Sequence, residues 1–179
     1  MSATDPRWSA IIADLDSLRP DRAIDGIVWV ISAARLQAAT EAERQALGRY
    51  AYARVHELQD AFAYALPVYV VVSQCDSLVG FDAFWQAQDV RLRNEIVGWS
   101  SPSIDDNGLP AEWVPKVFNK LIESMRALVL ATATSKDEIK DVDDFFLFPQ
   151  HMRSLEKPLL SFLEALFKPN VYETRSFCR

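Results

Sequence analysis

The chain has 179 residues, of which 50% are apolar and 25% charged, a composition typical of a folded domain rather than a disordered segment. Its formal net charge of −6 argues against bulk binding to the phosphate backbone of nucleic acids. Two cysteines are too few for a disulfide framework, and no signal-peptide pattern or membrane-length apolar run is found, so we expect an acidic, soluble, cytoplasmic domain with no membrane span.

The first forty residues predict a helix followed by a strand. Apolar residues recur at helical spacing over 8–18, and Pro20 ends that segment. The run Gly26 to Ile31 (GIVWVI) is β-branched and uncharged, which predicts a strand buried on both faces.

The next segment predicts a long helix and a second strand. Thr40 and Glu43 have capping-box spacing at the start of the helix, which ends before Pro67. Val68 to Val72 (VYVVV) again has the composition of a doubly buried strand. A strand, a helical crossover and a second strand form a βαβ unit, so this half is expected to be α/β with parallel strands.

The second half is predicted to be mostly helical. The segment 81–97 favours one or two short helices, and the composition of 100–110 is that of a loop. Helical periodicity continues over 113–129 and 152–167, with Pro158 predicting a kink or a break in the last helix. The remaining predictions are a turn or short helix over 141–148, leading to Pro149, and a third strand beginning within 171–177.

Two parallel strands alone make a poor sheet, since both edges stay open and little area is covered. The chain is therefore expected to be a piece of a larger α/β sheet, with further strands before Met1 and after Arg179. The alternative is that one strand is wrongly assigned and the second half is essentially a helical structure.

Few residues have the pattern of a catalytic or metal site. His56 and His151 have no third ligand at metal-binding spacing, and Cys75 and Cys178 have no catalytic partner. The five glycines never form the G-x-x-x-x-G-K phosphate loop, which excludes a self-sufficient nucleoside triphosphatase in this chain alone.

One motif follows the second strand directly. Ser73-Gln74-Cys75-Asp76 lies at the carboxyl edge, where open α/β sheets bind ligands. GTP-binding proteins place [N/T]-K-x-D there, and the Asp accepts hydrogen bonds from guanine. The alternative is that Asp76 is a turn former or a helix cap.

The segments 19–36 (RPDRAIDGIVWVISAARL) and 66–85 (LPVYVVVSQCDSLVGFDAFW) resemble the IcmF/TssM family of bacterial type VI secretion systems. The string P-V-Y, C-D and G-F in the second segment is the most specific part of the resemblance. The resemblance extends over nearly the whole chain, with further matches at Gly98, Phe148-Pro149 and Leu166-Phe167.

The resemblance implies an α/β fold: a partial GTPase-like (P-loop NTPase-type) parallel sheet without its phosphate loop, followed by a helical extension. Residues 1–80 would be the second half of the GTPase-like core and 81–179 the extension. Asp76 matches the family's base-reading Asp, Ser73 its Thr and Gln74 its Lys. Gln has a shorter stem and no charge, so it cannot cover a purine as Lys does.

The resemblance also implies the function. The first hypothesis is a structural module in the cytoplasmic part of a TssM-like protein, at the inner membrane, contacting inner-membrane and baseplate subunits. Phe84, Trp85, Trp99 and Trp113 are candidate contact residues, although core packing is the favoured interpretation of each. The parent is expected to be a homo-oligomer, and the chain alone neither an enzyme nor a nucleotide binder.

Two alternatives remain open. The intact parent could bind GTP or ATP as a nucleotide-dependent switch, whereas this chain has no cofactor of its own. The chain could instead be a free-standing helical adaptor unrelated to secretion, which would be a stable monomer when expressed alone.

Overall fold

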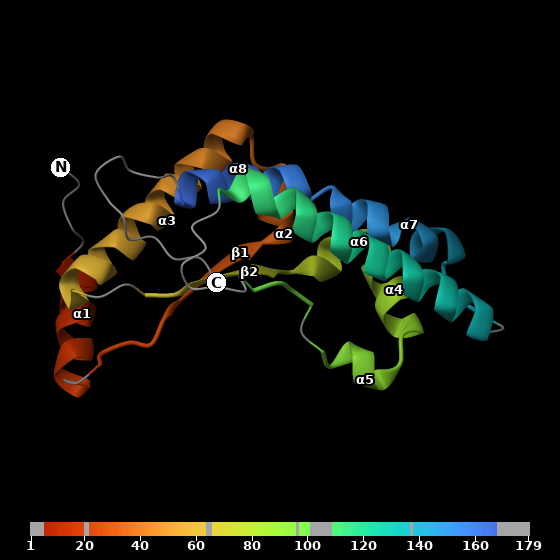
Figure 1. Cartoon of the computed structure of the whole chain (residues 1–179), viewed down its shortest axis with the longest axis horizontal. Helices are drawn as coiled ribbons and strands as arrows, with labels where there is room; N and C mark the ends of the chain where they lie inside the picture. The colour runs from red at the N-terminus through yellow and green to blue at the C-terminus, as the bar shows by residue number, and fades with distance from the viewer. Residues whose placement is uncertain are drawn as a thin grey trace.

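Two parallel strands form the sheet of this protein, in a computed structural model that describes residues 6–19, 22–63, 66–95, 97–100, 109–136 and 138–167. β1 (Ile27–Ser32) pairs with β2 (Val68–Ser73) from Ile27 opposite Val68 to Ser32 opposite Ser73. The first helix is α1 (Pro6–Leu18), and the crossover between the strands contains α2 (Ala33–Ala38) and α3 (Glu41–Phe62) (Figure 1). The predicted parallel βαβ unit is confirmed, with two helices in the crossover instead of one.

The described part of the chain after β2 contains helices and no further strand. A 3₁₀ turn and five α-helices follow in order: η1 (Cys75–Ser77), α4 (Phe81–Ala87), α5 (Val90–Arg93), α6 (Pro110–Ser135), α7 (Val142–Arg153) and α8 (Glu156–Leu166). The strand predicted within 171–177, Cys178 and most of the loop predicted at 100–110 lie outside the described residues.

The start of α3 has the capping box that its sequence predicts. The Thr40 hydroxyl accepts a hydrogen bond from the Glu43 N–H (3.3 Å), and the Glu43 carboxylate accepts one from the Thr40 N–H (2.7 Å). The pKa of Glu43 lies below its ordinary value, because hydrogen bonds stabilise its charged carboxylate. The larger effect comes from the backbone N–H of Thr40 and the smaller from its hydroxyl.

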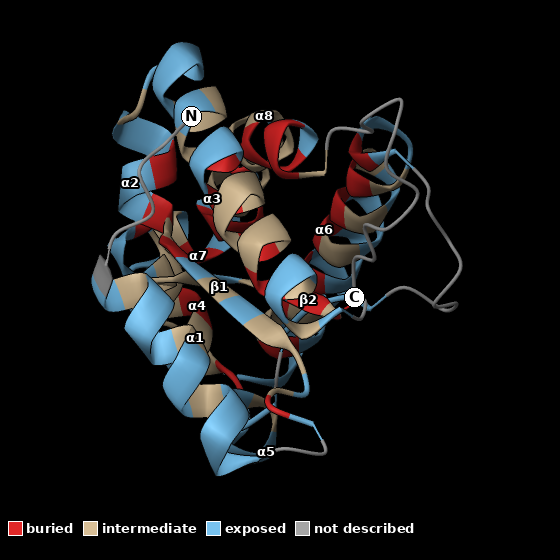
Figure 2. Cartoon of the chain, turned by 90° about the vertical axis from the view of Figure 1, so that its left-hand side faces the viewer, coloured by how far each residue is buried: buried red, intermediate tan, exposed pale blue. Residues whose placement is uncertain are grey.

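The helices pack against one face of the sheet. α8, near the end of the described chain, lies along α3 from the first half, while α6 packs beside α7 and α8 (Figures 1 and 2). Gly48 of α3 permits α3 and α8 to approach closely, because a Cβ there would lie 2.5 Å from the Phe162 carbonyl oxygen of α8. Large side chains from both halves fill the core: Ile31, Leu36, Val55, Val68, Phe84, Ile122, Phe145, Phe148, Phe162 and Leu166.

The prediction that both strands are buried on both faces is wrong. Ile31 and Val68 are buried and their alternate neighbours pack against the core, but Val28 and Val30 are 61% and 59% exposed. Tyr69 and Val71 of β2 are exposed on the same side, at 39% and 44%. The described helices thus cover one face only, although the composition of both strands is that of a fully covered sheet.

Proline has different effects in the last two helices. The helix predicted to end near Pro149 continues to Arg153, and Pro149 is itself buried inside α7. Burial of the neighbouring side chains Phe145 and Phe148 offsets the local cost of a proline inside a helix. The break predicted from Pro158 is confirmed: α7 ends at Arg153, α8 begins at Glu156, and Pro158 lies in the first turn of α8, where no hydrogen bond is lost.

Candidate functional site

The carboxyl ends of the two strands meet at one edge of the sheet. Ser32 and Ser73 are the last residues of β1 and β2 and are register partners. Ser32 also caps α2, since its Oγ accepts a hydrogen bond from the Arg35 N–H at 3.0 Å. Ser73 is followed by Gln74 in the left-handed conformation (φ 56°), and this turns the chain directly into η1.

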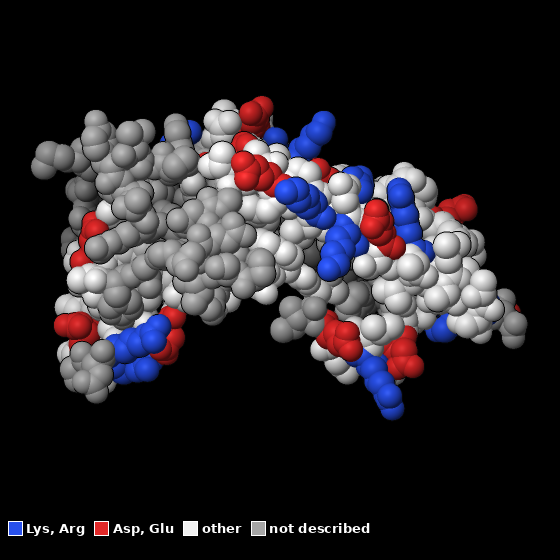
Figure 3. All heavy atoms as spheres, in the orientation of Figure 1, with Lys and Arg blue, Asp and Glu red and all other residues white. Residues whose placement is uncertain are grey.

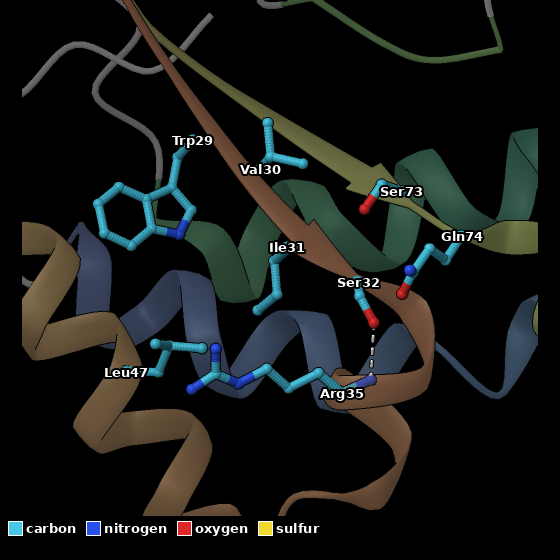
Figure 4. A pocket seen from close by; sticks show the side chains of 8 residues that line it. All are labelled: Trp29, Val30, Ile31, Ser32, Arg35, Leu47, Ser73 and Gln74. Atoms are coloured by element: carbon cyan, nitrogen blue, oxygen red, sulfur yellow. Dashed lines mark hydrogen bonds between the residues drawn. The ribbon is translucent and has the colours of Figure 1, made fainter.

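A pocket of about 300 Å³ opens at this edge. Its lining comes from β1, from α2 and α3, and from the end of β2 (Figure 4): Trp29, Val30, Ile31, Ser32, Arg35, Leu47, Ser73 and Gln74. Two of the three residues singled out from the sequence, Ser73 and Gln74, are therefore brought together here. The third, Asp76, is exposed on η1 and is not part of the lining.

The pocket combines one cation with small polar groups and an aromatic wall. Within the described part of the chain, no ion pair or hydrogen bond involves the Arg35 guanidinium or the Gln74 amide. The Trp29 ring at the other side packs edge-on against Tyr50, with 6.1 Å between ring centroids. Such a set can bind a small polar or anionic group, but it contains no general base beside a nucleophile.

Cys75 is not an activated nucleophile. Its thiol is half-buried and donates a hydrogen bond to the Val72 carbonyl at 3.6 Å. Burial, with a smaller contribution from the Asp76 carboxylate, raises the pKa of this thiol, so it stays protonated at neutral pH.

The two histidines lie on different helices. His56 Nδ1 on α3 is 2.8 Å from Asp60 Oδ2, an ordinary pair one helical turn apart, and His151 lies on α7. No group of three His, Cys, Asp or Glu side chains placed to hold a metal ion occurs among the described residues.

The candidate contact aromatics have different environments. Phe84 is buried and its ring lies 4.8 Å from that of Phe148, so core packing is its role. Trp85 is half-buried, whereas Trp99 is 40% exposed and stacks on Trp113 with 4.8 Å between centroids.

Sequence reasoning missed Ser32, Arg35 and Trp29 as pocket residues. The signal that could have found Ser32 is parallel pairing itself, because the end of the first strand must lie at the same sheet edge as Ser73. Arg35 follows three residues later, on the short helix that Ser32 caps.

Comparison with known proteins identifies the family. A model of the IcmF-related N-terminal domain matches residues 3–179. The type VI secretion system component TssM1 of Pseudomonas aeruginosa (strain PAO1) is 29% identical over 176 residues, which are 96% of this chain and 16% of that protein. The chain thus spans about a sixth of the length of this relative.

No solved structure matches the chain. No helix in the described ranges is both long and apolar enough to span a bilayer. The match extends over almost the entire sequence, including both strands and the residues that line the pocket. The chain therefore belongs to the IcmF-related family and corresponds to the family's N-terminal domain.

Proposed function

We propose that the chain is an assembly module of a type VI secretion membrane complex, and that it supports protein secretion by holding subunits together. The family and the name of the TssM1 relative support a role in this system. The proposal includes a position at the cytoplasmic face of the inner membrane, contacts with inner-membrane and baseplate subunits, and a homo-oligomeric parent.

The incomplete sheet is the observation that carries this proposal. Among the described residues, each strand pairs with the other and has no hydrogen-bonded neighbour at its second edge. In a parallel sheet, unpaired strand edges leave backbone hydrogen-bonding groups open to pairing with other chains, and an uncovered apolar face stays in contact with water. Proteins normally cover both. A chain with these features suits a component that is completed by contacts with other polypeptide.

The fold that we propose with this function is the partial GTPase-like sheet, with 1–80 as part of the α/β core and 81–179 as a helical extension. The parallel pair and the pocket at its carboxyl edge support it. α8, in the proposed extension, packs directly on α3 of the proposed core, so the two parts share one hydrophobic interior.

Deletion of the gene in its host tests the function. We expect loss of type VI secretion, measured as loss of killing of competitor bacteria, with recovery when the intact gene is restored. A tagged protein should also copurify inner-membrane and baseplate subunits from cross-linked cells. Undiminished killing by the deletion strain would refute the proposal.

A second candidate function is a nucleotide-dependent switch in the intact protein, and the observation that favours it is the pocket lined by Ser73 and Gln74. Here GTP or ATP would bind at the carboxyl edge, and Asp76 would have to move to read the base, because it lies outside the lining. Calorimetric titration of the full-length protein with each nucleotide tests this candidate. Absence of binding heat with both would eliminate it.

A further inference from the structure

Most polar side chains of the pocket at the carboxyl edge are unused within the described chain. The Arg35 guanidinium, the Ser73 hydroxyl and the Gln74 side-chain amide line this pocket, and none of them makes a hydrogen bond or an ion pair with another described residue. The lining, as far as it is described, contains no Asp or Glu, although the chain has 25 acidic and 19 basic residues. The pocket therefore offers a positive charge and hydrogen-bond donors, which suit a negatively charged ligand rich in acceptors.

The positive charge and the neutral polar groups lie in different parts of the pocket. Figure 4 shows the Arg35 side chain extending toward Leu47, on the side of the pocket where Trp29 lies. Ser73 and Gln74 lie at the other end, where β2 finishes (Figure 4). A ligand that uses both parts has its anionic group at one end and neutral polar groups at the other.

Hydrogen bonds at both ends of α2 hold Arg35 in place. At the start, the Ser32 Oγ accepts a hydrogen bond from the Arg35 N–H at 3.0 Å. At the end, Arg44 Nη1 donates to the carbonyl oxygens of Leu36, at 3.1 Å, and Ala39. Leu36 is itself fully buried, so the helix is anchored in the core. Binding of an anion thus requires ordering of the Arg35 side chain, but no rearrangement of the helix that carries it.

The volume of the pocket limits the ligand to a small molecule. About 300 Å³ is at the lower end of the range for ligand pockets and equals the volume of roughly ten water molecules. On the face that Figure 3 shows, acidic and basic side chains of the described residues are interspersed, without a broad basic area. This face gives a polyanion such as nucleic acid no surface to bind along, whereas the pocket can hold a small anion through Arg35.

We infer that the pocket binds a small organic anion, whose phosphate or carboxylate group pairs with the Arg35 guanidinium and whose neutral polar groups bond to Ser73 and Gln74. Both anionic groups match the planar fork of a guanidinium, which can form two parallel hydrogen bonds with them. The inference goes beyond the nucleotide-dependent switch proposed for the same pocket, because it assigns recognition to the anionic group and not to a base. GTP and ATP would then bind with similar affinity, without a contribution from Asp76, which lies outside the lining.

Binding of simple probes to the full-length protein tests the inference. Ribose 5-phosphate and gluconate carry a phosphate or a carboxylate together with hydroxyl groups, and ribose is the neutral control. We expect at least one of the two anions to bind in calorimetry and saturation-transfer NMR, at least tenfold more tightly than ribose, with an affinity that falls as salt is added. The preferred anion distinguishes phosphate from carboxylate recognition. No binding of either anion, or equal binding of ribose, would overturn the inference.

Substitution of the cation provides the second measurement. Arg35→Gln should lower the affinity about tenfold or more, because the charged fork is lost, and Arg35→Lys should lower it less. Arg49→Gln is the matched control, since Arg49 is exposed on α3 and lies outside the lining. Ser73→Ala, with an expected loss of several-fold, replaces Arg35→Gln if thermal melting shows that this variant is unfolded. Undiminished affinity in the folded variant, or an equal loss with Arg49→Gln, would overturn the inference.

Titrations with GTP and ATP separate this inference from the proposed switch. Binding of ribose 5-phosphate through Arg35, without binding of either nucleotide, would leave the inference intact and eliminate the switch. Binding of GTP alone, lost in Asp76→Asn and kept in Arg35→Gln, would support the switch and overturn the inference. The gene-deletion experiment tests the secretion role independently of both.

Discussion

Gly48→Ala tests whether α3 and α8 are in the close contact that the structure gives them. A methyl group at this position would lie 2.5 Å from the Phe162 carbonyl oxygen and 2.6 Å from the Ala165 Cβ. Both atoms belong to α8, and the carbonyl oxygen is backbone, so it cannot rotate away. In a close-packed interior the two helices would have to separate by about 1 Å.

The size of the effect follows from two opposing contributions. Replacing Gly by Ala inside a helix favours folding by about 1 kcal/mol. Overpacking a rigid contact typically costs about 1–3 kcal/mol, and a gap of about 1 Å also removes a quarter to a half of the dispersion attraction along the interface. The side chains that lose this dispersion attraction are Phe162 and Leu166, which are both at most 2% exposed. We therefore expect a net loss of about 1–3 kcal/mol, equivalent to a fall of about 2–12 °C in Tm.

Urea unfolding followed by far-ultraviolet circular dichroism measures this difference. Gly98→Ala is the control, because nothing lies within 4 Å of a Cβ at that position. The double variant Gly48→Ala/Ala165→Gly should not recover the loss, because the 2.5 Å contact with the backbone oxygen remains and a glycine inside α8 itself costs about 1 kcal/mol. An unchanged or increased free energy of unfolding for Gly48→Ala would refute the reasoning.

Further predictions concern the cap, the second constrained glycine and a buried hydrogen bond. Thr40→Ala should lower the free energy of unfolding by about 1 kcal/mol in urea titrations, because the capping box loses its hydroxyl. The pKa of Glu43 in the folded state lies below its ordinary value of 4.5, so the charged carboxylate contributes to folding stability above that pH. This contribution is lost as the pH falls through the lowered pKa. Glu43→Gln should therefore make Tm fall less steeply on acidification. Gly80→Ala combines a φ of 82° with a Cβ 2.2 Å from a backbone oxygen of α7, and should lower Tm more than Gly48→Ala does. Thr132→Val should cost about 1–2 kcal/mol in thermal or urea unfolding, because the buried Gln88 side-chain oxygen then loses its 3.3 Å donor; no change would mean that water replaces it.

Local signals in the sequence were sufficient for the elements whose determinants are local. The capping box of α3 requires only Thr40 and Glu43 at the right spacing, and both hydrogen bonds are present. The parallel pairing followed from two β-branched runs separated by a helical crossover.

The elements that depend on distant packing could not be predicted in this way. α7 passes through Pro149 because that proline and its phenylalanine neighbours are buried against α6, the preceding helix, and against α4, which lies far earlier in the sequence. The exposure of Val28 and Val30 depends on where every other helix packs, and β-branched composition alone does not report it.

The candidate site was predicted in part for a similar reason. The carboxyl-edge rule drew attention to Ser73 and Gln74, and both line the pocket at the end of the strands; their role in binding a base stays a prediction. It did not anticipate that Gln74 adopts a left-handed conformation and leads into η1, where Asp76 is exposed. Arg35 was missed because the short helix α2 was not predicted as a separate element.

The contact between α3 and α8 has a consequence for synthesis of the protein on the ribosome. The apolar stripe of α3 is complete when Phe62 has been added, but α8, which covers it, follows roughly a hundred residues later, about 5–20 s at bacterial translation rates. During that interval the nascent chain exposes the stripe to chaperones and to other nascent chains, and native packing must wait until the last described helix has left the exit tunnel.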